Sequence, residues 1–137
     1  MDLPSLREDL ARLAHRVDVA VVSMHAGTEY SAKPNPQQVA FAEAAIDAGA
    51  RIVVGHHPHV TGPWVRRGDG VIFYSLGNLV FDQFQRLDTQ RGALAEIVFE
   101  GPRLARAGLL PVEIVGTAPR LAGITAPAES SAGPGPR

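Results

Sequence analysis

The chain has 137 residues, of which 45% are hydrophobic and 20% are charged, and its formal net charge is −1. This composition is typical of one globular domain with a hydrophobic core rather than of a disordered chain. A net charge near zero argues against a nucleic-acid-binding protein, which usually carries a basic face. The chain has no cysteine, so disulfide bonds and thiolate metal sites are excluded, and nitrogen or oxygen atoms must hold any metal ion.

The sequence contains no signal for membrane insertion or export. No apolar run approaches the roughly 20 residues that a membrane-spanning helix needs, and the first residues do not resemble a secretory signal peptide. As it stands, the sequence predicts a soluble and unexported chain. This expectation applies only to a complete protein, so the localisation is unknown from the sequence.

Helix and strand patterns alternate in the first part of the chain. Apolar residues recur at three- and four-residue spacing from Leu3 to Val17, which predicts an amphipathic helix ending near residues 15–16. Ser5 and Glu8 have the spacing of a capping box for its first turn. Residues 17–23 are mostly β-branched and apolar without alternation, which is typical of a strand covered on both faces in a parallel sheet.

A loop over residues 26–35 leads to a second predicted helix. Asn35 is suited to cap it, Pro36 fits its first position, Gln38 can reach back to the cap, and Gly49 is the expected end. Residues 51–55 form a short apolar strand. The order helix, strand, helix, strand predicts a right-handed crossover between parallel strands.

The pattern becomes antiparallel after residue 60. Residues 66–70 are typical of a turn and residues 71–75 of a strand, while residues 93–100 and, more loosely, 109–115 alternate apolar and polar side chains. Ala, Pro, Gly and Ser predominate from about residue 118. We therefore predict an α/β domain over residues 1–117 and a disordered tail over residues 118–137.

Histidines gather at the ends of the two predicted parallel strands. Three of the five lie in the segment GHHPHV at residues 55–60, and His25 follows the earlier strand. Ligands of open α/β sheets bind at the carboxyl ends of the strands, so neighbouring strands would bring these imidazoles together.

A divalent metal is the ligand that this arrangement favours. Pro58 biases His57 towards an extended backbone, in which His57 and His59 share a side and His56 faces elsewhere. We therefore predict that His57 and His59 are metal ligands and that His25 is a third; imidazole suits zinc, iron and manganese. The alternative is that each histidine is an ordinary hydrogen-bonded turn residue.

Two further polar residues follow strands. Glu29 lies four residues after His25 and could be a metal ligand, a carboxylate that orients a histidine, an acid–base catalyst or a solvated loop residue. Asn78 closes the strand over residues 71–75 and could contact a metal or a phosphate, or serve only as a turn residue. We treat both as candidate catalytic residues.

Four motifs together resemble the CapA family of bacterial capsule and poly-γ-glutamate synthesis proteins. They are HAGTEY at residues 25–30, AGA at 48–50, GHHPHV at 55–60 and FYSLGNLVFD at 73–82, in the order that the family has them. The resemblance covers roughly residues 10–100. It implies a calcineurin-like metallophosphoesterase fold, an αββα sandwich with a divalent metal centre at the strand ends. In that site His25, His57 and His59 would be ligands, and Glu29 and Asn78 fall in family motifs.

The resemblance also implies that part of the site is missing. Family members carry an amino-terminal half with an aspartate motif, further carboxylates and an Asn-His pair, and this sequence contains none of them. Two functions follow. In the first, the chain is a capsule or poly-γ-glutamate synthesis protein that carries half of a metal-dependent hydrolase site and is inactive alone. In the second, it is an accessory or structural fragment that pairs with a missing amino-terminal half, or with itself, in the cell-envelope polymer machinery.

Overall fold

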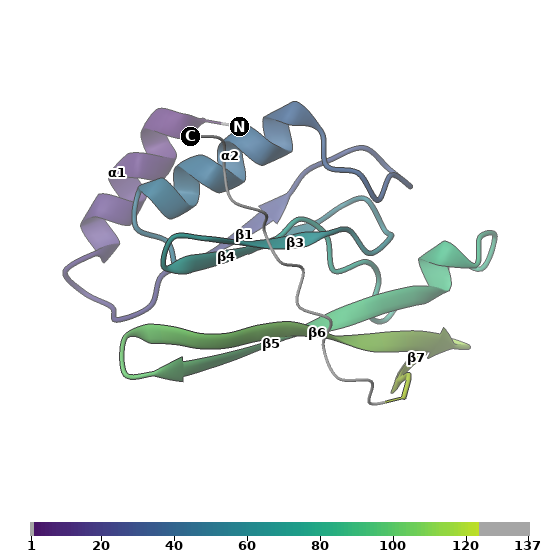
Figure 1. The fold of residues 1–137 in the computed structure, drawn as a ribbon. Coiled ribbons are helices and arrows are strands. Elements are labelled where there is room, and N and C mark those ends of the chain that lie inside the picture. The colour runs from purple at the N-terminus through teal and green to yellow at the C-terminus, as the bar shows by residue number, and fades with distance from the viewer. Residues whose placement is uncertain (1, 124–137) are drawn as a thin grey trace, which may run out of the picture.

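Three layers of secondary structure make up residues 2–123, the part of the chain that the computed structural model describes (Figure 1). Two helices cover a four-stranded sheet of order β1-β2-β4-β3, and a three-stranded antiparallel sheet of order β5-β6-β7 lies on its other side. The elements are α1 (Leu3–Leu13), β1 (Val21–His25), α2 (Pro36–Asp47), β2 (Ile52–His56), β3 (Trp64–Arg67), β4 (Gly70–Phe73), the 3-10 helix η1 (Asp88–Gln90), β5 (Arg91–Glu100), β6 (Arg103–Val115) and β7 (Ala118–Leu121).

The predicted fold class is confirmed. Strand β2 is parallel to both of its neighbours, β1 and β4. Strand β3 pairs with β4 in antiparallel fashion, and β5, β6 and β7 also pair in antiparallel fashion. Of the four αββα layers, a helical layer on the outer face of the second sheet is not found within residues 2–123. None of the helices in this part of the chain is both long and apolar enough to cross a membrane.

Helix α1 begins with a different cap from the one predicted. The side chain of Asp2 accepts hydrogen bonds from the Ser5 backbone N–H at 3.3 Å and the Ser5 hydroxyl at 2.6 Å. The proposed Ser5–Glu8 capping box is therefore wrong, because a cap must precede the first helical residue and Ser5 is already inside the helix. The helix also ends at Leu13, earlier than predicted.

Helix α2 forms as predicted. The Gln38 N–H donates to the Asn35 side chain at 2.9 Å, and the Asn35 N–H donates to the Gln38 side chain at 3.4 Å, which completes a capping box. Gln38 is buried, and its amide also donates to the Tyr74 carbonyl at 2.8 Å. Gly49 ends the helix with φ at +104°.

Strand β1 is an edge strand, although the sequence predicted one covered on both faces. It runs over Val21–His25, later than the predicted residues 17–23, and pairs only with β2 among the described strands. Val21 is 54% exposed and Val17 is 43% exposed. The apolar composition is therefore that of an inner strand, whereas the position is that of an edge.

Three features of the antiparallel part differ from the prediction. Residues 64–67, partly assigned to a turn, form β3, and the turn is confined to Gly68 and Asp69 between β3 and β4. Strand β6 begins at Arg103 rather than at residue 109. Ala118–Leu121, assigned to the tail, form β7 because they pair with β6. The rest of the predicted tail, residues 124–137, lies outside the described residues.

Two hydrophobic clusters hold the layers together. The first joins the helices to the sheet through small and β-branched residues such as Ala42, Ala45 and Val53, which are fully buried. The second joins the two sheets around Phe73 and Val71. Because β2 and β4 take part in both clusters, the central strands are fixed from either side, and the loops at their carboxyl ends start from a rigid base.

Candidate metal centre

The histidines meet at the carboxyl ends of β1 and β2, where the sequence placed them. The parallel register aligns His25 with His56, the last residue of each strand. The backbone N–H of Ala26 donates to the His56 carbonyl at 3.2 Å, and that of Tyr30 donates to the Pro58 carbonyl at 2.8 Å. These two bonds tie the loop after β1 to the histidine turn after β2.

The backbone of the histidine turn is not extended. His57 has φ at +89° and His59 has φ at +61°, in the left-handed region that residues other than glycine rarely adopt. The extended conformation predicted from Pro58 is therefore wrong, and His56 does not face elsewhere, since it lines the same cavity as His25, His57 and His59. Two such residues cost about 1–3 kcal/mol each, and strain of this kind concentrates at functional sites.

Glycine and proline support this strained turn. Pro58 is fully buried. A Cβ atom at Gly55 would lie 1.9 Å from the Tyr74 carbonyl oxygen, so only glycine allows this close approach. The Leu76 N–H donates to the Gly55 carbonyl at 3.0 Å, which fixes the end of β2 against the segment that follows β4. The turn therefore starts from a point held by backbone contacts.

His25 and His57 lie close enough to share one metal ion. Their Nε2 and Nδ1 atoms, respectively, are 3.2 Å apart, and the ring centroids are separated by 5.0 Å. Two nitrogen ligands of a tetrahedral zinc ion, each about 2.1 Å from the metal, lie about 3.4 Å apart. The observed separation therefore fits a shared ion, and in its absence one imidazole can donate to the other.

Glu29 joins the cluster from the loop after β1. One ligand atom from each of Glu29, His57 and His59 lies within 4.8 Å of the other two. It is the one group of three or more such residues with this spacing in residues 2–123. Glu29 is exposed, whereas both histidines are partly buried. The carboxylate is thus the solvent-exposed member of the group.

Asn78 contacts a histidine rather than open solvent. Its side-chain oxygen lies 2.9 Å from Nδ1 of His59, and only 6% of Asn78 is exposed. The same histidine ring packs against Phe81, at a centroid distance of 5.3 Å, and against Tyr30 at 6.3 Å. The structure therefore brings all five predicted site residues, His25, Glu29, His57, His59 and Asn78, into one neighbourhood.

The site opens into a cavity of about 300 Å³. Four histidines line one part of it, and Leu76, Leu79, Val80, Phe81 and Leu94 line another. Burial lowers the pKa of His56, and repulsion from His25 lowers it further, which favours the neutral form of this imidazole. The cavity thus combines imidazole nitrogen atoms with an apolar wall.

The side chains present fit a divalent transition metal. Imidazole nitrogens and one carboxylate are the donors that zinc, iron and manganese accept in proteins. A calcium or magnesium site would need more oxygen donors than Glu29 alone supplies here. The donor set therefore favours a divalent transition metal over calcium or magnesium.

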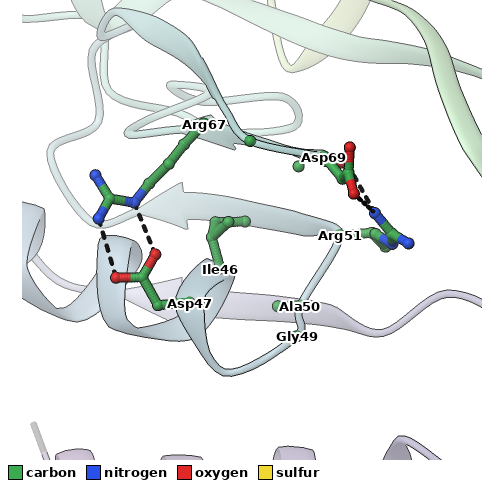
Figure 2. Close-up of a pocket in the computed structure, with 9 residues that line it drawn as sticks. Ile46, Asp47, Gly49, Ala50, Arg51, Arg67 and Asp69 are labelled. Carbon is green, nitrogen blue, oxygen red and sulfur yellow. Dashed lines mark hydrogen bonds and ion pairs between the residues drawn. The ribbon is translucent and has the colours of Figure 1, made fainter. Parts of the chain in front are cut away.

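A larger cavity lies at the opposite end of the sheet, near the start of β2 (Figure 2). Its volume is about 490 Å³. Arg67 donates to both carboxylate oxygens of Asp47, at 3.0 and 2.9 Å, and Arg51 lies 3.2 Å from Asp69. Because a carboxylate compensates each arginine, this cavity offers no free charge for a ligand, and the histidine cavity is the better candidate despite its smaller size.

Sequence reasoning missed the groups that hold Asn78. Its amide nitrogen donates to the Thr89 carbonyl at 3.0 Å and to the Gln83 side chain at 3.2 Å. Thr89 is buried, and its hydroxyl donates to the carbonyls of Gln83 and Arg86. No spacing in the sequence signals these contacts, because they depend on the course of an irregular loop.

The fold and the cluster define a class: mixed α/β proteins with a histidine and carboxylate site at the carboxyl ends of parallel strands. The family model of the bacterial capsule synthesis protein PGA_cap matches residues 1–83, more than half of the chain. The chain therefore belongs to this family, which confirms the resemblance seen in the motifs.

Three relatives agree with this assignment. The chain is 58% identical over 66 residues to a capsule biosynthesis protein CapA of Bacillus anthracis, covering 48% of this chain and 16% of that protein. It is 44% identical over 97 residues to a PGA biosynthesis protein CapA of Bacillus subtilis, covering 71% and 25%. It is 41% identical over 66 residues to a probable polyglutamine synthesis accessory protein of Mycobacterium tuberculosis, covering 47% and 17%. The matches thus span a quarter or less of each relative.

Proposed function

We propose that the chain serves in the synthesis of capsule or poly-γ-glutamate and carries part of a metal-dependent hydrolase site. The names of its relatives support the process. The observation that carries the chemistry is the convergence of Glu29, His57 and His59 within 4.8 Å at the carboxyl ends of two parallel strands. The cell-envelope polymer machinery is the partner that this role implies.

In this proposal His25, His57 and His59 hold a divalent metal ion. Such an ion would polarise a phosphoryl or acyl group and lower the pKa of bound water. Glu29, the exposed member of the group, supplies the negative charge and a proton acceptor close to the imidazoles. Asn78 acts on His59, with which it shares a hydrogen bond.

The direct test is to titrate the purified chain with Mn²⁺ and with Zn²⁺ and to measure the heat of binding by calorimetry. We expect weak, saturable binding that is lost in a His57→Ala/His59→Ala double variant. A His15→Ala variant is the matched control, because His15 is exposed and follows helix α1, far along the chain from the site. Equal binding by the double variant would refute the ligand assignment.

The partial site also predicts what the chain does not do. Manganese-dependent hydrolysis of a generic phosphodiester by the chain alone should be close to background, because one carboxylate and three imidazoles are too few to hold and bridge two ions. Turnover that depends on manganese and disappears in the double variant would contradict this reading.

A second role, as a module that pairs with a missing amino-terminal half, is favoured by the edge of β1. This strand exposes Val21 and ends at His25, so a further strand paired parallel to it would also end beside the histidines. We propose that such a strand, from another polypeptide or a second copy, covers this edge. Sedimentation over a range of concentrations tests self-association, which Val21→Lys should weaken. A monomer at all concentrations would exclude a second copy as the partner of this edge and leave a different polypeptide as the partner.

A further inference from the structure

The backbone around Asn78 leaves its side chain little freedom. Gly77 has φ at +70° and forms a bridge with Gly92. A Cβ atom at Gly92 would lie 1.8 Å from the Asn78 carbonyl oxygen, so the start of β5 packs directly on the Asn78 backbone. The Asn78 backbone is therefore held against the start of β5 before any side-chain contact is considered.

The hydrogen bonds of Asn78 determine which way its amide points. The amide nitrogen faces two acceptors, the Thr89 carbonyl at 3.0 Å and the Gln83 side-chain oxygen at 3.2 Å. Turning the amide over would place its oxygen against the Thr89 carbonyl, which cannot donate. The amide oxygen must therefore face Nδ1 of His59, 2.9 Å away.

This orientation selects one form of the His59 ring. An amide oxygen only accepts, so Nδ1 of His59 must carry the proton. In a neutral imidazole the other nitrogen, Nε2, then keeps its lone pair. Phe81 and Tyr30 pack on the same ring and limit its rotation.

We propose that Asn78 is a positioning residue that holds His59 as its Nδ1–H tautomer and so presents Nε2 as the ligand atom of the site. The part that concerns the metal rests on the proposed function, whereas the tautomer follows from the contacts of this chain alone. Asn78 is then neither a metal ligand nor a catalytic residue, because the contacts that define it are with His59, Thr89 and Gln83.

The test is nitrogen NMR of the metal-free chain labelled with ¹⁵N-histidine, at about pH 8.5, where ordinary imidazoles are neutral. Signals are assigned by comparison with a His59→Gln variant. We expect His59 to show a protonated Nδ1 and an unprotonated Nε2. A protonated Nε2 in the unmodified chain would overturn the proposal, whether or not the chain binds metal.

Three variants separate positioning from general support of the loop. Asn78→Ala removes the acceptor, so His59 should lose its preference for the Nδ1–H form. Asn78→Asp keeps an acceptor for Nδ1 of His59 and should retain the Nδ1–H form, although its second oxygen then faces the Thr89 carbonyl and should lower stability. Thr89→Val removes the hydroxyl contacts of the loop but keeps the backbone carbonyl to which Asn78 donates. In this variant His59 should also keep its preference for the Nδ1–H form. A loss in Thr89→Val equal to that in Asn78→Ala would refute the specific role of Asn78.

A metal titration of the same variants tests the link to the site. Loss of the group that orients a ligating histidine typically lowers metal affinity by about 10–100-fold. We expect such a loss in Asn78→Ala and little change in Thr89→Val. If Asn78→Ala alters the tautomer while zinc affinity is unchanged, the link to the metal is wrong; if the unmodified chain binds no metal at all, it is the proposed function that fails.

Discussion

Replacing Gly55 by alanine should destabilise the protein through one contact at the end of β2. The added Cβ would lie 1.9 Å from the Tyr74 carbonyl oxygen and 2.5 Å from its carbon, whereas real Cβ atoms essentially never come within 3.0 Å of such atoms. The strand must therefore move by more than an ångström. Both sides of the contact are backbone, so no side-chain rotation can relieve it, and we expect a loss of about 3 kcal/mol or more in the free energy of unfolding.

Gly116→Ala is the matched control for this variant. Gly116 has φ at +63°, and a Cβ there meets no atom within 4 Å. Its replacement therefore costs only the left-handed backbone, about 1–2 kcal/mol. Urea unfolding followed by circular dichroism measures both losses. If Gly55→Ala costs no more than Gly116→Ala, the close approach of β2 to residue 74 is not the feature that holds the histidine turn.

Three further predictions concern the caps, the charges and the site. Asn35→Ala removes one half of the capping box and should lower the free energy of unfolding by about 1 kcal/mol, measured by urea unfolding. Hydrogen bonds from Arg67 lower the pKa of Asp47. The stabilisation by the ionised Asp47 is therefore fully present above the ordinary Asp pKa and is lost as the pH falls through the lowered pKa. Asp47→Asn should reduce the loss of stability that the protein shows below about pH 4. Glu29→Gln keeps the size of the side chain but removes its charge, so zinc affinity measured by calorimetry should fall; unchanged affinity would place this carboxylate outside the metal centre.

Local signals predicted helix α2 almost completely. Asn35, Pro36 and Gln38 act within one turn of each other, and Gly49 acts at the residue where the helix ends. All of these contacts involve near neighbours in the sequence, so their spacing alone contains the information. The contact from Gln38 to the Tyr74 carbonyl, which the sequence did not predict, joins segments 36 residues apart.

The strands show where such local reasoning stops. The composition of residues 17–23 correctly indicated a strand parallel to the next one, but not its position at the edge of the sheet. Position depends on which strands lie on either side, and that information is not contained in the segment itself. Strands β3 and β7 were missed because, unlike β4, they carry no apolar run of their own and are defined by pairing with a neighbour.

The site illustrates both limits at once. The position of His25 and of the GHHPHV segment after two apolar runs was enough to predict that their imidazoles would meet, since parallel neighbours end at the same edge. The conformation of the turn was predicted wrongly, because the preference imposed by Pro58 on His57 is weak beside the tertiary contacts that bury Pro58 and bind its carbonyl. Local preference decides only where tertiary structure leaves a choice.

The position of Glu29 shows why this site needs the loop after β1 to be held in place. Glu29 is exposed and comes from a loop without regular structure, yet its carboxylate lies within 4.8 Å of two histidines. The adjacent Tyr30 explains this, since its N–H donates to the Pro58 carbonyl, between the two histidines of the turn. A backbone bond cannot be removed by changing the side chain of Glu29, so Glu29→Gln should leave the geometry intact, and any loss of metal affinity in that variant reports the charge itself.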